Sequence, residues 1–179
     1  MAQQEQLTPH DRRMHALMNR TEGEPLYRTA GRRRAVVVAH IALTVAAVAA
    51  WLGTVVGESS WAMWAMLGLL LPWCVATGVI NGATRGLLEL RPRALDERQR
   101  GERERVRARA HQAMTWLLLA AVVGTGLAGF SGVDFKALVF QVTFCVFIAQ
   151  WLMPLWIAGL TARDEPLDEA DDVAAGAAG

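Results

Sequence analysis

The sequence predicts an all-α protein, a bundle of four transmembrane helices, and three observations support this prediction. Charged residues make up 20% of the chain, yet four long stretches contain no Asp, Glu, Lys or Arg. Each stretch has about the 20 mostly apolar residues that a helix needs to cross the hydrocarbon core of a bilayer. Arginines gather before the first stretch and between the second and the third.

These four stretches define the predicted spans and the organisation of the chain. The spans run from Ala35 to Val56, from Trp61 to Ile80, from Gln112 to Phe130 and from Ala137 to Leu160. Residues 1–34 form a predicted N-terminal arm, residues 35–160 the four-helix membrane domain with an arginine-rich linker at 82–111, and residues 161–179 an acidic tail. The tail has too little apolar surface to offset the entropy of ordering, so we expect it to be disordered.

The basic residues predict the orientation of the chain in the membrane. Seven arginines lie in the N-terminal arm and nine in the central linker, whereas the other two loops contain a single basic residue, Lys136. Cytoplasmic loops are enriched in Lys and Arg close to membrane spans. We therefore expect a multi-pass protein of the inner (plasma) membrane, with both termini and the central linker in the cytoplasm.

The N-terminal arm contains a helix start signal. Thr8 is a good N-cap, Pro9 suits the first helical turn, and Asp11 complements the helix dipole. This predicts a short amphipathic helix from about Pro9 to Asn19, with methionine and leucine side chains on one side. Such a helix either lies on the membrane surface or forms part of a solvated arm.

Small residues recur at four-residue spacing in the first and third spans. Ala49, Gly53 and Gly57 are spaced in this way in and just after the first span, and Ala120, Gly124 and Ala128 in the third. Small side chains let helix backbones approach closely in a membrane. We therefore expect the third span to form the closely packed centre of the bundle.

The central linker predicts a helix that continues into the third span. Asp96 is a plausible N-cap, and Gln99 stands three residues later, as in a capping box. The helix should start near Glu97. Its arginines are candidates for contact with anionic lipid headgroups or with a protein partner, and they are Arg98, Arg100, Arg103, Arg105, Arg107 and Arg109. Nucleic acid is not an expected partner, because acidic residues alternate with the basic ones and cancel their field.

The block from Leu95 to Gln99, followed by an arginine-rich helix and a span, resembles a pattern in uncharacterised small multi-pass membrane proteins of actinobacteria. The resemblance implies a small helical membrane protein and no particular activity.

A second pattern suggests an internal repeat. The segment Ala39-His40-Ile-Ala-Leu-Thr44 is similar to Ala110-His111-Gln-Ala-Met-Thr115, and Cys74-Val75 matches Cys145-Val146 at the same offset. The bundle would then consist of two copies of one helical hairpin, by analogy with repeat-built membrane folds. The alternative is a chance match between apolar sequences of low complexity.

Polar residues inside the spans are the candidates for intramembrane contacts. They are His40, Thr44, Asn81, Gln141 and Gln150. They line a polar pathway or ligand pocket, or they make hydrogen bonds between helices, which are worth about 0.6 kcal/mol on average. We favour the second interpretation. An amide near mid-bilayer such as that of Gln150 must be paired, so we expect it to face the inside of the bundle.

The sequence contains no recognisable catalytic or metal-binding motif. Its two cysteines stand apart from each other and from His or acidic residues. His40 and His111 invite comparison with a haem-binding pair, but their depths match poorly, so we expect no cofactor. The absence of Asp, Glu, Lys and Arg from the spans counts against a proton-coupled pump. We predict a non-enzymatic accessory or regulatory membrane protein; the alternative is a small oligomeric transporter or channel component.

Overall fold

The computed structural model describes residues 8–18, 24–91, 95, 97–131 and 135–162. The described residues form six helices and no strand, so the all-α prediction is confirmed. The helices are α1 (Pro9–Met18), α2 (Glu24–Tyr27), α3 (Ala30–Val55), α4 (Ser60–Ala83), α5 (Glu97–Phe130) and α6 (Phe135–Thr161). The predicted tail, 161–179, lies outside the described residues from residue 163 onward, as does the predicted N-cap Asp96.

Four of the helices are long and apolar enough to cross a membrane, as predicted. They are α3, α4, α5 and the part of α6 from Val139 to Thr161. In the apolar window of each helix, between 6% and 22% of the residues are buried inside the protein. Most of their apolar surface therefore faces outward, which is compatible with contact to lipid.

The helix ends follow local sequence signals. The Thr29 side chain accepts a hydrogen bond from the Arg32 backbone N–H at 3.3 Å, so α3 begins at Ala30 and includes the arginine cluster. Helix α5 begins at Glu97, as predicted, and continues without a break through the third predicted span. Helix α1 also forms as predicted, with the Asp11 backbone N–H donating to Thr8 Oγ1 at 3.3 Å.

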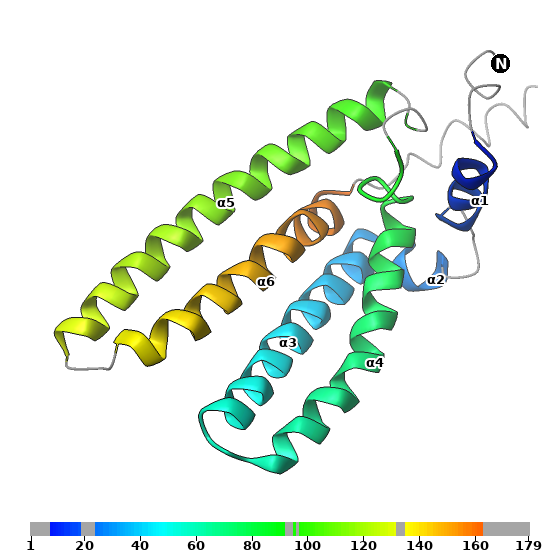
Figure 1. Ribbon diagram of the computed structural model, residues 1–179. Helices are drawn as coiled ribbons and strands as arrows, with labels where there is room; N and C mark the ends of the chain where they lie inside the picture. Colours follow the sequence, from blue (N-terminus) through cyan, green and yellow to red (C-terminus); the bar gives the residue numbers. More distant parts are fainter. Residues whose placement is uncertain (1–7, 19–23, 92–94, 96, 132–134, 163–179) are drawn as a thin grey trace, which may run out of the picture.

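The long helices form two hairpins, α3–α4 and α5–α6, that meet through α3 and α6 (Figure 1). Helix α6 packs beside α3 and also contacts α4, whereas α5 packs along α6 and makes at most marginal contact with the other two. At the far ends of the hairpins, the loop between α3 and α4 lies apart from the end of α5 in Figure 1.

The prediction that the third span lies at the centre of the bundle is wrong. Helix α5 lies at the edge of the assembly, beside α6 alone. Gly124, Gly126 and Gly129 have no other atom within 4 Å of the position that a Cβ would occupy. Small residues at helical spacing permit close approach of another helix, but they do not specify which helix fills the space.

The tightest packing lies where α3, α4 and α6 meet. Val37, Ile80 and Leu155 form a buried cluster there. Gly159 lies against the first two, because a Cβ on this glycine would stand 2.6 Å from Val37 Cγ2 and 3.1 Å from Ile80 Cγ2. This glycine therefore allows the close approach of the two hairpins.

The start of the linker folds back onto this end of the bundle. Residues 84–90 form tight turns, and Leu87 packs with Val106 of α5 and Ala158 of α6 in a second buried cluster. The Arg103 guanidinium donates to the carbonyls of Leu90 and Leu88, at 2.8 and 3.1 Å. One arginine of the predicted contact surface is thus used to hold the linker against α5.

Candidate functional site: a polar cluster between three helices

His40 lies at the centre of the most connected polar group in the described part of the chain. It stands on α3, its side chain is 0% exposed, and α4 and α6 pack around it. A buried polar ring needs hydrogen-bond partners, because in an apolar surrounding an unpaired group costs several kcal/mol. Both ring nitrogens have such partners.

The partners of His40 determine its tautomer. Trp156 Nε1 of α6 lies 2.9 Å from His40 Nδ1, and an indole N–H can only donate. Nδ1 therefore accepts, and the neutral ring has its proton on Nε2. That proton is donated to Thr77 Oγ1 of α4, at 2.9 Å. A proton on Nδ1 would face the indole N–H, so this arrangement fits the neutral ring only.

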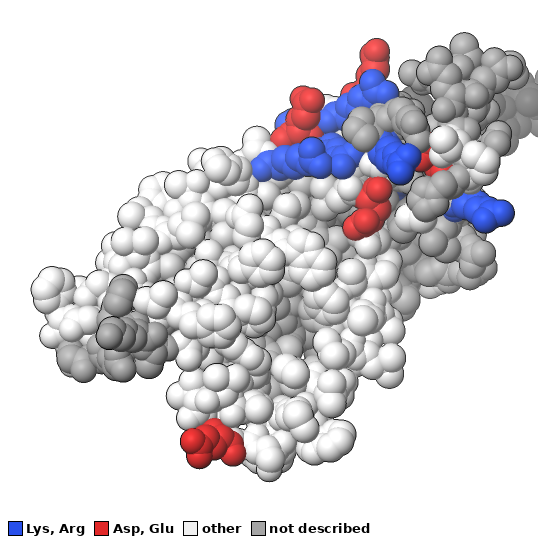
Figure 2. All heavy atoms as spheres, in the orientation of Figure 1, with Lys and Arg blue, Asp and Glu red and all other residues white. Residues whose placement is uncertain are grey.

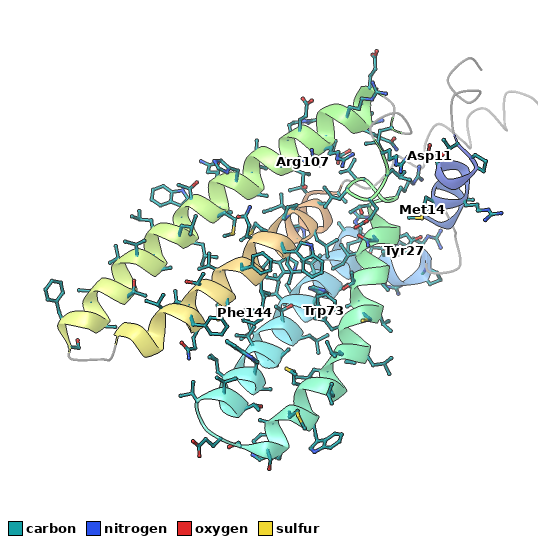
Figure 3. The ribbon with its side chains drawn as sticks, viewed as in Figure 1. Asp11, Met14, Tyr27, Trp73, Arg107 and Phe144 are labelled. Carbon is teal, nitrogen blue, oxygen red and sulfur yellow. The ribbon has the colours of Figure 1, made fainter. Side chains whose placement is uncertain are left out.

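A second set of hydrogen bonds ties α3 to α4. Trp73 Nε1 donates to Thr44 Oγ1 at 2.9 Å, and Thr44 Oγ1 donates to the His40 carbonyl at 2.8 Å. In the same way, Thr77 Oγ1 donates to the Trp73 carbonyl at 2.9 Å. Each threonine hydroxyl thus accepts from the facing helix and donates to a carbonyl of its own helix. The two helices are joined reciprocally, and Figure 3 shows Trp73 between them.

Aromatic rings complete the packing between the helices. The His40 ring lies 4.9 Å from the Trp73 ring and 6.3 Å, nearly edge-on, from the Trp156 ring. Farther along α3 and α6, the Trp51 and Phe144 rings are 4.5 Å apart. The contacts of His40 with Trp156 and of Trp51 with Phe144 join α3 to α6, where the two hairpins meet.

The geometry of the cluster indicates a structural role. Both nitrogens of His40 are occupied, so a metal ion or cofactor would first have to displace Trp156 or Thr77. The second histidine of the pair compared with a haem-binding site, His111, is exposed on α5. No group of three or more His, Cys, Asp or Glu side chains that could hold a metal is found among the described residues. The cluster therefore joins three helices by hydrogen bonds, and of the five predicted polar residues it contains His40 and Thr44.

The remaining polar residues in the spans do not join the cluster. Asn81 is half-buried near the end of α4, where its carbonyl accepts from the Gly86 N–H at 2.9 Å. Gln141 is half-buried on α6, and its Oε1 is buried without a hydrogen-bond partner. The prediction that Gln150 faces the inside of the bundle is wrong, because its side chain is exposed. Gln150 stands on the side of α6 opposite Leu152 and Gly159, which face the other helices.

Three members of the cluster were missed as site residues: Trp73, Thr77 and Trp156. A signal for them exists in the sequence. Tryptophan is typical of membrane interfaces, but Trp73 and Trp156 stand within the predicted spans. His40, Thr77 and Trp156 also lie three to five residues from the same predicted membrane surface, so their depths match.

The predicted arginine surface divides into two groups. Arg100 and Arg103 bind backbone carbonyls of the linker, with Arg100 Nε donating to the Leu95 carbonyl at 3.1 Å. The side chains of Arg98, Arg105, Arg107 and Arg109 are exposed, and Arg105 Nε donates to the Gly101 carbonyl of its own helix at 3.2 Å. Figure 2 shows that charged side chains gather at this end of the molecule, while the helical body presents a broad uncharged face.

Arg33 joins this charged end to the bundle. It is 7% exposed, and its guanidinium donates to the carbonyls of Tyr27 and Ala162, at 3.3 and 2.9 Å. The start of α3 is thereby tied to the end of α6. Tyr27 in turn packs on Gly82 of α4, with 3.5 Å between its ring and the position of a Cβ on that glycine.

No protein-family model, no curated protein and no solved structure matches the chain. The resemblance in the block from Leu95 to Gln99 therefore stays a prediction.

Proposed function

We propose that the chain is a non-enzymatic multi-pass protein of the plasma membrane that serves as an accessory or regulatory partner of another protein. Its contact surface is the first part of α5, with both termini on the same, cytoplasmic side. The observation that supports this most is the exposed arginine set on a rigid helix. Arg105, Arg107 and Arg109 stand on a helix that continues into an apolar span, and Arg103 fixes the linker beside it.

A rigid, charged surface of this kind suits a partner that has carboxylates or phosphates. Guanidinium groups bind both in a bidentate manner. Lipid headgroups offer the same chemistry at about 1 kcal/mol per basic residue near the surface. A specific protein partner should differ from lipid in its sensitivity to the position of the charges, because lipid responds mainly to their number.

The test compares two pairs of arginines on the same side of the molecule. The tagged protein is purified from its native membrane in mild detergent, and co-purifying proteins are quantified. We expect Arg107→Gln with Arg109→Gln to abolish a stoichiometric partner. Arg28→Gln with Arg34→Gln removes the same charge from exposed positions before and within α3 and should leave the partner bound. Equal loss in both double variants, or no stoichiometric partner of the parent protein, would contradict the proposal.

A second candidate is a small oligomeric transporter or channel component. It is favoured by two amides on α6. Gln141 Oε1 is buried and has no hydrogen-bond partner among the described residues, and the exposed Gln150 side chain has none among them either. In liposomes, solute flux above that of empty vesicles and lost on Gln141→Leu and Gln150→Leu would support this candidate. Flux equal to that of empty vesicles would remove it.

A further inference from the structure

Gln150 is placed where an unpaired amide is most costly. It stands eleven residues after Val139 and eleven before Thr161, at the centre of the apolar part of α6. Its side chain is exposed, and it has no hydrogen-bond partner among the described residues. At the middle of a bilayer no water is available to act as the hydrogen-bond partner, and each unsatisfied polar group costs several kcal/mol.

The surface around Gln150 on α6 is uncharged and includes large apolar side chains. Thr143 and Phe147 precede it at spacings of seven and three residues, so the three side chains form a stripe on one face of the helix. Phe147 is 66% exposed, and Trp151, beside the stripe, is 69% exposed. The stripe contains no charged residue, so a second helix can approach it without repulsion.

The chemistry of the amide indicates what covers this stripe. A glutamine side chain has both donors and an acceptor, so two glutamines can bond to each other reciprocally. In a symmetric dimer the same patch faces itself on both subunits. Because all copies of a membrane protein insert in the same orientation, the Gln150 side chains of two copies lie at the same depth. Another protein would need a matching polar group at that depth, whereas a second copy supplies it by symmetry.

We propose that the chain forms a parallel homodimer through the stripe of Thr143, Phe147 and Gln150, with reciprocal hydrogen bonds between the two Gln150 amides at its centre. The proposal relies on the membrane placement given under the proposed function but not on any partner. The arginines of α5 lie on a different helix, so dimer formation and partner binding can fail independently.

The test measures dimer formation of the purified, fluorescently labelled full chain in liposomes as the ratio of protein to lipid is varied. Interhelical hydrogen bonds contribute about 0.6 kcal/mol each on average, so two reciprocal bonds correspond to about an eightfold change in the dimer dissociation constant. We expect Gln150→Leu to weaken the dimer by about this factor. Gln150→Asn keeps the amide on a shorter side chain and should restore part of the affinity.

A matched control separates the amide from the general effect of an added leucine. Gln112 is exposed at the start of the apolar part of α5, near the membrane surface where water can satisfy it. Gln112→Leu should leave the dimer dissociation constant unchanged. An equal effect of both substitutions, or a parent protein that remains monomeric at every protein-to-lipid ratio, would overturn the proposal.

Cysteine cross-linking gives a second measurement, which reports the position of the interface. The native cysteines, Cys74 and Cys145, form no disulfide, so both are first replaced by alanine. Phe147→Cys in this background should form an intermolecular disulfide in native membranes on mild oxidation. Val123→Cys, exposed on α5, should not. Cross-linking that is equally strong at both positions would indicate random collision and overturn the proposed interface.

Discussion

At the scale of single residues, the structure depends on side chains that act across helices at one depth. His40 receives a hydrogen bond from Trp156 and donates one to Thr77, so one ring joins α3 to both α6 and α4. The protonation state of the ring is set by these partners, since an indole can only donate. The contribution of His40 to stability should therefore depend more on the hydrogen-bonding groups of its neighbours than on the volume that its side chain fills.

A double-mutant cycle tests the hydrogen bond between His40 and Trp156. His40→Leu leaves the indole N–H without an acceptor, and Trp156→Phe removes that N–H. We expect each single substitution to destabilise the protein and the pair to show a coupling free energy of about 0.6 to 1.7 kcal/mol. The measurement is the free energy of unfolding in mixed detergent micelles.

The control for this cycle is provided by the second histidine. His111 is exposed on α5, so His111→Leu should leave the free energy of unfolding nearly unchanged. A coupling free energy near zero between His40 and Trp156 would mean that the bond does not form in solution.

The crossing at Gly159 allows an equally specific prediction. Gly159→Ala would place a methyl group 2.6 Å from Val37 Cγ2, and valine has little freedom to move away because it is branched at Cβ. We expect a loss of about 1–3 kcal/mol in the free energy of unfolding, as for other overpacked positions. Thermal unfolding followed by circular dichroism in detergent is a suitable measurement.

A second glycine serves as the matched control. Gly126 stands within α5 with no atom within 4 Å of its Cβ position. Gly126→Ala should therefore be neutral or stabilising by up to about 1 kcal/mol, because alanine favours the helix. If both alanine variants lost stability equally, the loss at Gly159 would not be caused by overpacking at the helix crossing.

At the scale of helices, the sequence predicted well which helices exist and how long they are, but it predicted poorly how they pack against each other. Runs of apolar residues without charge define helices that can cross a bilayer, and the start of α5 at Glu97 was predicted from the capping-box pattern of the sequence. The face that each helix buries did not follow. In a membrane helix both the lipid-facing and the protein-facing sides are apolar, so hydrophobic periodicity gives little information on orientation.

Matched residues in the two hairpins show this limit. Gly53 and Gly124 both belong to small-residue series, but a Cβ on Gly53 would contact Ala62 at 3.5 Å, whereas one on Gly124 would meet nothing. Likewise His40 is buried and His111 is exposed. The predicted internal repeat pairs these histidines, and it stays a prediction. The paired residues occupy different surroundings.

The short helix α1 is held by a capping arrangement that can be tested alone. Asp11 Oδ2 accepts from Thr8 N at 3.1 Å and from Thr8 Oγ1 at 2.7 Å, and its Oδ1 lies 3.8 Å from Arg91 Nε. Asp11→Ala should destabilise the helix by about 1 kcal/mol, a typical value for a lost cap. Faster amide hydrogen exchange across residues 9–18 would report this loss.

Arg91→Gln separates the ion pair from the cap. The Arg91 side chain is 59% exposed, so its pairing with Asp11 should contribute less than about 1 kcal/mol. Exchange in α1 should therefore change far less than in Asp11→Ala. A larger effect of Arg91→Gln would mean that α1 is held by its attachment to the linker rather than by its own cap.

At the scale of the whole molecule, charge is segregated along the long axis. The arginines of α3, of the linker and of α5 lie at one end, and the opposite loop between α3 and α4 contains Glu58 as its single charged residue (Figure 2). This asymmetry is the physical basis for the proposed orientation, since basic residues near spans are retained in the cytoplasm. Two arginines at that end, Arg33 and Arg103, also hold backbone carbonyls, so the same residue type serves orientation and packing.

Single cysteines introduced into a chain lacking Cys74 and Cys145 test the orientation of the whole molecule. Ser59→Cys, in the loop between α3 and α4, should react with a membrane-impermeant maleimide in intact cells. Ala16→Cys on α1 and Arg98→Cys on α5, both at exposed positions, should react only after the membrane is permeabilised. Labelling of Arg98→Cys in intact cells would place the arginine surface outside, and a cytoplasmic partner would then have no access to it. Labelling in the expected pattern would restrict the partner of the α5 arginines to the cytoplasm and the inner leaflet.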